Sequence, residues 1–137
     1  MDKVSGKWRN NMAFDLQLDE LTIPVDSDPA FGGSGYGPRP KDLMLTALAG
    51  CTGMDVVSIM GKMKVPFTGL RLEIAGEKAE THPKVYTKVH VTYVVSGSDL
   101  PREKVQRAVD LSLNEYCGVA ATLKKTAELT HEIIFDS

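Results

Sequence analysis

The sequence predicts an α+β fold in a single domain that spans residues 1–137. Three observations predict it: apolar residues alternate with period two near both ends, one long apolar helical segment lies between them, and a hairpin pattern follows that segment. The order is strands, helix, hairpin, helices and strand, which indicates mostly antiparallel pairing. A chain of 137 residues is long enough for one hydrophobic core of ordinary size and too short for two such cores.

The first strands are predicted within residues 3–26. Phe14, Leu16 and Leu18 alternate with polar residues, and the alternation resumes at Leu21, which is typical of a half-buried β-meander. Residues 26–40, DSDPAFGGSGYGPRP, then concentrate glycine and proline and can continue neither a helix nor a strand. We expect a long surface loop there, and loops of this length are often functional.

A helix is predicted over residues 41–63, with Pro40 in its first turn. Apolar residues occupy almost every face of this segment, so we expect it to be central, packed between a sheet and another helix or another chain. Its most apolar stretch is interrupted by polar residues and is expected to fall short of the roughly 20 apolar residues of a membrane span.

Two strands and a hairpin are predicted after this helix, around residues 70–74 and 85–95, with the link Glu80-Thr81-His82-Pro83 between them. A final strand is predicted near the end of the chain, where apolar residues and His131 alternate with polar ones over residues 129–135.

The last helices are predicted between the hairpin and the final strand. Ser98-Asp99 is a candidate N-cap and Pro101 an early helical position. The helical spacing of the apolar residues that follow places Cys117 on or near the buried face. Gly118 is expected to break this helix before a short piece over residues 119–125.

Charge and terminal composition exclude some classes of function. A net charge of −2 and a pI near 5.9 provide no broad basic field for phosphates, so a nucleic-acid partner is not expected. The segment MDKVSGKWRNN is polar where a signal peptide would be apolar, so we expect a cytosolic protein with no membrane partner.

The two cysteines carry the main chemical possibilities: inert core, metal ligand or redox site. Cys51 lies within the apolar helix, where a thiol is inert unless a nearby cation stabilises the thiolate. Asp55, one turn later, would oppose a thiolate if it pointed at the sulfur. Arg9 and Arg39 are the candidate cations, although each is also a plausible surface charge.

Metal binding and histidine chemistry have little support in the sequence. His82, His90 and His131 fall in a loop and two strands, without the His-x-x-x-His spacing of a helical metal site, so no metal is expected. The methionines of the central helix are expected to be core, with a hydrophobic ligand cavity as the alternative.

The segment PRPKDLMLTALAGCTGMDVVSIM resembles the central-helix signature of the OsmC and organic hydroperoxide resistance family. The resemblance continues through EKAETHPKVYTKVHVTYVVSG and LPREKVQRAVDLSLNEYCGVA to Cys117, and is strongest to a less characterised OsmC-like branch. It implies antiparallel sheets wrapped around long central helices in an intertwined homodimer, with active sites at the subunit interface.

The resemblance also implies an activity. Cys51 would be the peroxidatic cysteine that reduces organic hydroperoxides in an antioxidant reaction, and Cys117 would resolve its sulfenic acid as a disulfide. No bound cofactor is implied; an external dithiol of the lipoyl type would be the reductant. An arginine, either Arg9 or Arg39, and a carboxylate complete the family's site. Lys41 stands where the family has its glutamate, and Asp42 is the nearest acid.

Two other functions stay open from the sequence. A noncatalytic dimer of the same fold would bind an apolar ligand or sense redox state through the same thiols, and Lys41 favours this alternative because it removes the carboxylate that orients the arginine. A structural dimer with two inert thiols is the other.

Overall fold

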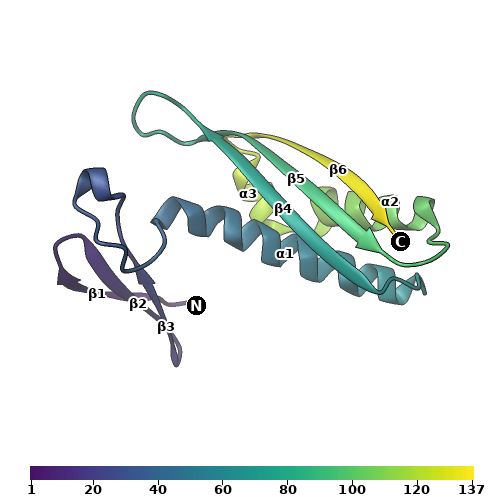
Figure 1. Cartoon of the computed structure of the whole chain (residues 1–137), viewed down its shortest axis with the longest axis horizontal. Coiled ribbons are helices and arrows are strands. Elements are labelled where there is room, and N and C mark those ends of the chain that lie inside the picture. The colour runs from purple at the N-terminus through teal and green to yellow at the C-terminus, as the bar shows by residue number, and fades with distance from the viewer. The chain divides into compact units, whose positions relative to one another are not determined.

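The computed structural model describes residues 1–137, which form two compact units, Met1–Met44 and Leu45–Ser137. The α+β fold predicted from the sequence is confirmed, with a three-stranded sheet in each unit (Figure 1). In chain order, the helices follow β3 and precede β6. The single domain over 1–137 stays a prediction.

The first unit contains the predicted meander, with strands β1 (Ser5–Asn10), β2 (Ala13–Leu18) and β3 (Leu21–Val25) paired antiparallel in that order. Tight turns join the strands. Trp8 and Leu21 are exposed within the chain, at 60% and 71%, so the half-buried character expected for this sheet is not complete within one chain.

The predicted loop follows β3 and contains a single 3₁₀ turn, η1 (Pro29–Phe31). The loop folds around the buried carboxylate of Asp26, which accepts backbone N–H bonds from Ser27, Ser34 and Tyr36 at 2.7, 2.9 and 3.1 Å. These bonds, that of Ser34 foremost, lower the pKa of Asp26. A Cβ on Gly33 would lie 1.7 Å from the Ser27 carbonyl oxygen, which explains why glycine is needed there.

Helix α1 spans Pro40–Lys62, as predicted. One side of it is buried within the second unit through Leu48, Thr52, Val56 and Met60. Its length and composition would also suit a membrane span, which corrects the expectation that it falls short. This is weak support for a membrane location, because the core helix of a globular protein has the same composition.

The second sheet packs its inner face against the helices (Figure 1). Strands β4 (Gly69–Lys78) and β5 (Tyr86–Ser96) form the predicted antiparallel hairpin, and β6 (Glu128–Asp136) is the predicted final strand. β6 pairs with β5 in parallel, so three of the four strand pairings are antiparallel. The parallel pairing arises because the helices after β5 return the chain to the end of the sheet at which β5 begins.

Three helical segments connect β5 to β6: α2 (Arg102–Leu111), the π-helical turn η2 (Ser112–Tyr116) and α3 (Gly118–Leu123). The predicted N-cap at Ser98-Asp99 is wrong, because α2 begins after Pro101 without a side-chain cap. The predicted break is present, but it falls at Cys117, whose backbone is extended, one residue before Gly118.

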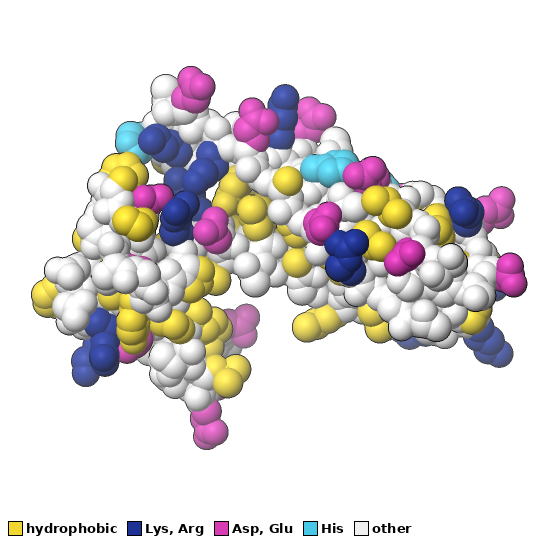
Figure 2. Space-filling view, in the orientation of Figure 1, with side chains coloured by type: hydrophobic (Ala, Val, Ile, Leu, Met, Phe, Trp, Pro, Cys, Tyr) yellow, Lys and Arg dark blue, Asp and Glu magenta, His cyan; other side chains and the backbone are white.

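Charged side chains of both signs are interspersed with apolar ones on the face of the molecule in Figure 2.

Candidate redox site

The two cysteines lie together in the second unit, although 66 positions separate them in the sequence. The sulfur atoms of Cys51 and Cys117 and a carboxylate oxygen of Asp55 all lie within 4.8 Å of one another. Both cysteines are free thiols. Cys51 is partly exposed, whereas Cys117 is 3% exposed and belongs to the core, as predicted. Cys51 is therefore the accessible thiol of the pair, and Cys117 is the buried one.

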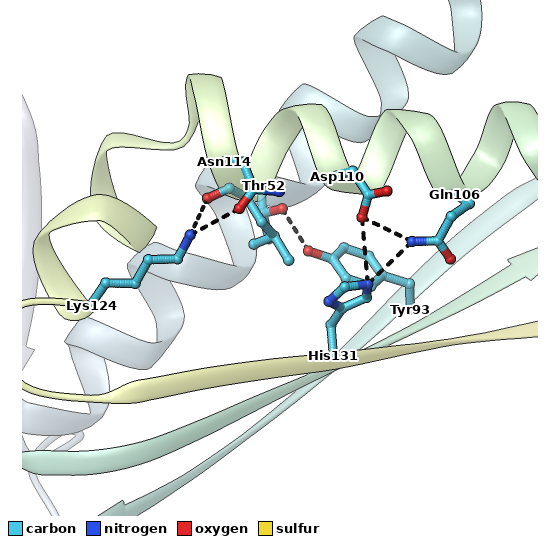
Figure 3. A network of polar contacts seen from close by, with 8 residues as sticks. Thr52, Tyr93, Gln106, Asp110, Asn114, Lys124 and His131 are labelled. Atoms are coloured by element: carbon cyan, nitrogen blue, oxygen red, sulfur yellow. Dashed lines mark hydrogen bonds and ion pairs between the residues drawn. The ribbon is translucent and has the colours of Figure 1, made fainter.

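The position of Cys117 depends on the π-helical turn. The Cys117 N–H donates to the carbonyl of Ser112 at 2.7 Å, closing a turn of five residues instead of four. This wider turn brings Ser112 and Cys117 to the same side, where both face α1. Lys124 supports the turn by donating to the Leu113 carbonyl at 2.6 Å (Figure 3). Helical turns of this kind are frequent at functional sites.

The environment of Cys117 keeps its thiol protonated. Burial, followed by its hydrogen bond with the Cys51 sulfur, raises the pKa of Cys117 to about 11. The Ala120 N–H donates to the Cys117 sulfur at 3.3 Å and opposes this rise. A thiol that keeps its proton at neutral pH can donate it toward the Cys51 sulfur. Cys117 therefore needs a proton acceptor before it can act as a nucleophile.

A chain of buried hydroxyls ends at the carboxylate of Asp55. The Tyr93 hydroxyl contacts Thr52 Oγ1 at 2.8 Å, Thr52 Oγ1 contacts Ser112 Oγ at 2.7 Å, and Ser112 Oγ donates to Asp55 Oδ2 at 2.9 Å. Each hydroxyl has one proton, so donation by Ser112 to Asp55 makes Thr52 the donor to Ser112 and Tyr93 the donor to Thr52. The chain thus points in one direction, toward the sulfurs.

Tyr93 has its proton available for this chain, because burial raises the pKa of Tyr93 to about 12. Its ring also meets His131 edge to face, with centroids 6.3 Å apart. His131 lies between Tyr93 and α2, where its Nε2 is 3.9 Å from Asp110 and 3.4 Å from the Gln106 amide (Figure 3). His90 and His131 are partly exposed, and each has a carboxylate partner, Glu132 for His90 and Asp110 for His131.

The three other predicted site residues belong to the first unit. Arg9 lies 3.4 Å from Asp15, and its guanidinium is 5.9 Å from the ring centroid of Tyr36. Arg39 pairs with Asp28 at 2.7 Å. Asp42 is in the first turn of α1. Both arginines have carboxylate partners in their own unit, and the roles of Arg9, Arg39 and Asp42 stay predictions.

Sequence reasoning missed Thr52, Ser112 and Tyr93 as members of the site. Thr52 and Ser112 are buried hydroxyls in helical segments that are otherwise apolar on the same face, and this was the available signal. Asp55 was identified only as a residue that would oppose a thiolate if it faced the sulfur, and it does face the sulfur.

Cys51, Asp55 and Cys117 also have the chemistry of a metal site, because two thiolates and a carboxylate are ligands of Zn²⁺. The sequence argument against a metal considered histidine spacings and did not consider this grouping. The two thiols can therefore form a disulfide, and each can exchange a proton with the carboxylate. All three groups together can hold a soft cation.

Comparisons with known proteins define the class. Residues 32–132 match the family described as OsmC-like protein. Protein YhfA of Escherichia coli K12 is 38% identical over 101 residues, which cover 73% of this chain and 75% of YhfA. The chain therefore belongs to the OsmC-like family, and the resemblance found in the sequence is confirmed.

Solved structures agree with this assignment at the level of the fold. An OsmC-like protein from Mycoplasma pneumoniae aligns with a TM-score of 0.84 at 12% identity, covering 100% of this chain and 98% of that one. The organic hydroperoxide resistance protein OhrB of Bacillus subtilis aligns with a TM-score of 0.63 at 22% identity, covering 97% of each chain.

Proposed function

We propose that the protein is a thiol-dependent peroxidase that reduces organic hydroperoxides to alcohols. The observation that carries this proposal is the unequal pair of thiols, with an accessible Cys51 in hydrogen-bond contact with a buried, protonated Cys117. OhrB, which has the same fold, is an organic hydroperoxide resistance protein by name. A pair of neighbouring thiols of this kind suits two-cysteine peroxide chemistry.

The reaction proceeds in three steps. The Cys51 thiolate attacks the distal oxygen of the hydroperoxide, the O–O bond breaks, and the released alkoxide takes a proton to become the alcohol. Cys117 then attacks the sulfenic sulfur of Cys51, forming a disulfide and releasing water. An external dithiol of the lipoyl type then reduces the protein disulfide and is itself oxidised to a disulfide. The protein holds no cofactor in this scheme.

We propose that the protein acts as a homodimer in the cytosol. Helix α1 leaves Met54 and Val57 exposed at 76% and 44%, although it is apolar on nearly all faces. Large apolar side chains exposed on a central helix favour a partner that covers them, and a second copy supplies an identical apolar helix. The first sheet, whose apolar residues are also uncovered, supplies more surface of the same kind.

The decisive experiment is peroxide consumption by the purified protein. Cumene hydroperoxide is supplied with dihydrolipoamide as reductant, and the wild type is compared with Cys51→Ser and Cys117→Ser. We expect turnover in the wild type, none in Cys51→Ser, and a single oxidation in Cys117→Ser that leaves a sulfenic acid trapped by dimedone. Wild-type consumption no faster than that of Cys51→Ser refutes the peroxidase.

A redox-sensing or ligand-binding dimer is the second candidate. It is favoured by Asp55, whose carboxylate opposes negative charge on the sulfurs, and by the carboxylate partners that Arg9 and Arg39 already have. This function predicts formation of the Cys51–Cys117 disulfide on oxidation, without multiple turnovers when dihydrolipoamide is in excess. The same assay therefore separates the two candidates.

A further inference from the structure

Asp55 is chemically out of place in a site whose first step needs a thiolate. Its carboxylate lies within 4.8 Å of both sulfurs, and a negative charge there opposes negative charge on sulfur. The position of Asp55 is nevertheless fixed, because Ser112 donates to its Oδ2 at 2.9 Å and Thr52 and Tyr93 support Ser112. These contacts hold the carboxylate beside the sulfurs, which suits a role in a step of the proposed reaction that follows the attack on peroxide.

The second step requires what a carboxylate can provide. Once Cys51 is a sulfenic acid it is neutral, and its charge no longer conflicts with Asp55. Cys117 is buried and protonated, and it must lose its proton to attack. The leaving hydroxide must gain one. The titratable groups that face Asp55 are Cys51 on its own helix, Cys117 before α3 and Tyr93 on β5. Burial raises the pKa of both Cys117 and Tyr93, so each of these two keeps its own proton at neutral pH.

We propose that Asp55 transfers the proton of the Cys117 thiol to the hydroxyl that leaves Cys51, and so catalyses formation of the disulfide. This inference rests on the proposed function and assigns a role that the predicted site residues do not include. Ser112 occupies Oδ2, and the remaining lone pairs of the carboxylate are available to the sulfur groups. Ser112, Thr52 and Tyr93 are positioning residues that orient the carboxylate.

The step balances without a further reactant. Cys117–SH and Cys51–SOH give the disulfide and one molecule of water. The Cys117 S–H bond and the Cys51 S–O bond break, and an S–S bond and an O–H bond form. The Cys51 sulfur, oxidised by the peroxide, is reduced as Cys117 is oxidised. Asp55 ends as the carboxylate that it was at the start, as expected of a general acid–base group.

The test uses Asp55→Asn in the full-length protein, because asparagine keeps the shape and a carbonyl oxygen that can accept the Ser112 bond, but cannot carry the proton. Asp110→Asn is the matched control: it removes a carboxylate of the same unit that contacts Gln106 and His131. Single-turnover oxidation with cumene hydroperoxide is followed by quenching, with dimedone marking the sulfenic acid and mass spectrometry the disulfide.

We expect Asp55→Asn to oxidise Cys51 at least as fast as the wild type and to form the disulfide about 100-fold more slowly, so that the sulfenic acid accumulates. Asp110→Asn should match the wild type in both steps. The Asp55→Asn rate should rise with pH as the Cys117 thiol ionises, whereas the wild-type rate should be much less pH-dependent near neutrality. Asp55→Glu should recover part of the rate, a rescue that a purely structural role does not predict.

Disulfide formation at the wild-type rate in Asp55→Asn overturns the proposal. A second oxidant separates this failure from failure of the peroxidase function. Diamide adds to the Cys51 thiol, and attack by Cys117 on that adduct expels a hydrazine that also needs a proton. If peroxide does not oxidise the wild type, the same slowing of the disulfide step with diamide still supports Asp55, and equal rates with diamide refute it.

Discussion

Replacement of Thr52 by valine isolates the energetic contribution of the buried hydroxyl chain. Thr52 is fully buried, and its hydroxyl contacts Tyr93 and Ser112 at 2.8 and 2.7 Å. Valine has nearly the same shape, so Thr52→Val leaves no large cavity. The substitution leaves the Tyr93 hydroxyl without an acceptor in the core, while Ser112 still donates to Asp55.

The expected cost follows from these contacts. An unsatisfied buried donor costs about 1–3 kcal/mol and a lost hydrogen bond about 0.5–1.5 kcal/mol, so Thr52→Val should lower the free energy of unfolding by about 2–4 kcal/mol. With a urea m-value of about 2 kcal/mol/M, the unfolding midpoint should fall by about 1–2 M. The measurement is urea denaturation under reducing conditions at one fixed protein concentration, since association affects apparent stability.

Tyr93→Phe supplies the control for this interpretation. In the double variant Thr52→Val/Tyr93→Phe the orphaned phenol is gone, so the loss of stability should be smaller than the sum of the two single losses by about 1–2 kcal/mol. Additivity of the two substitutions within about 0.5 kcal/mol would mean that the two hydroxyls do not interact, and would refute the hydroxyl chain.

Three further predictions concern the thiols, the loop and α1. In Cys51→Ser, alkylation of Cys117 by iodoacetamide should be slow at neutral pH and rise without a plateau up to pH 9, because burial, the largest cause of the raised pKa of Cys117, remains when the Cys51 sulfur is removed; a plateau below that pH contradicts the assignment. Asp26→Asn should lower the melting temperature at neutral pH. Folding lowers the pKa of Asp26, so its carboxylate stabilises the protein above the pKa of the unfolded state, and this stabilisation is lost as the pH falls through the pKa of the folded state. The difference in melting temperature between Asp26→Asn and the wild type should therefore disappear in acid. Met54→Lys should shift sedimentation from dimer to monomer, whereas Ile134→Lys on β6, exposed at 47%, should not; an unchanged dimer in Met54→Lys excludes this part of α1 from the interface.

The sequence was most informative where a regular pattern extended over many residues. The period-two alternation predicted the meander and the hairpin, and the unbroken run of helix formers predicted α1 to within a residue at each end. The N-cap of α2 was predicted incorrectly because Ser98-Asp99 lies in a bend in which Asp99 has a positive φ, and bends, turns and caps favour the same residues.

The candidate site was predictable only in part. The two cysteines were identified as chemical candidates from the sequence, and their roles as a peroxidatic and a resolving thiol came from the family resemblance. Their contact depends on a π-helical turn that inserts one residue into the helical repeat before Cys117. Periodicity places Cys117 near the buried face but cannot predict that insertion. Thr52 and Ser112 meet across 60 positions of sequence; a hydroxyl on an otherwise apolar helical face indicates that each needs a buried partner, but not which residue that partner is.

The hydroxyl chain and the thiol pair together explain why the core has polar groups at this point. Apolar residues in place of Thr52, Ser112 and Tyr93 would fill the same space in the core and leave no buried polar group in need of a hydrogen bond. Stability alone therefore does not require this chain of hydroxyls. Its direction, with every donor aimed toward Asp55, fixes one carboxylate beside two sulfurs. In the proposed reaction, a carboxylate so placed would disfavour the Cys51 thiolate that attacks peroxide and would favour the proton transfer that closes the disulfide. The arrangement is therefore better suited to resolving an oxidised Cys51 than to activating a reduced one, and resolution is the step at which we expect this site to be most sensitive to substitution.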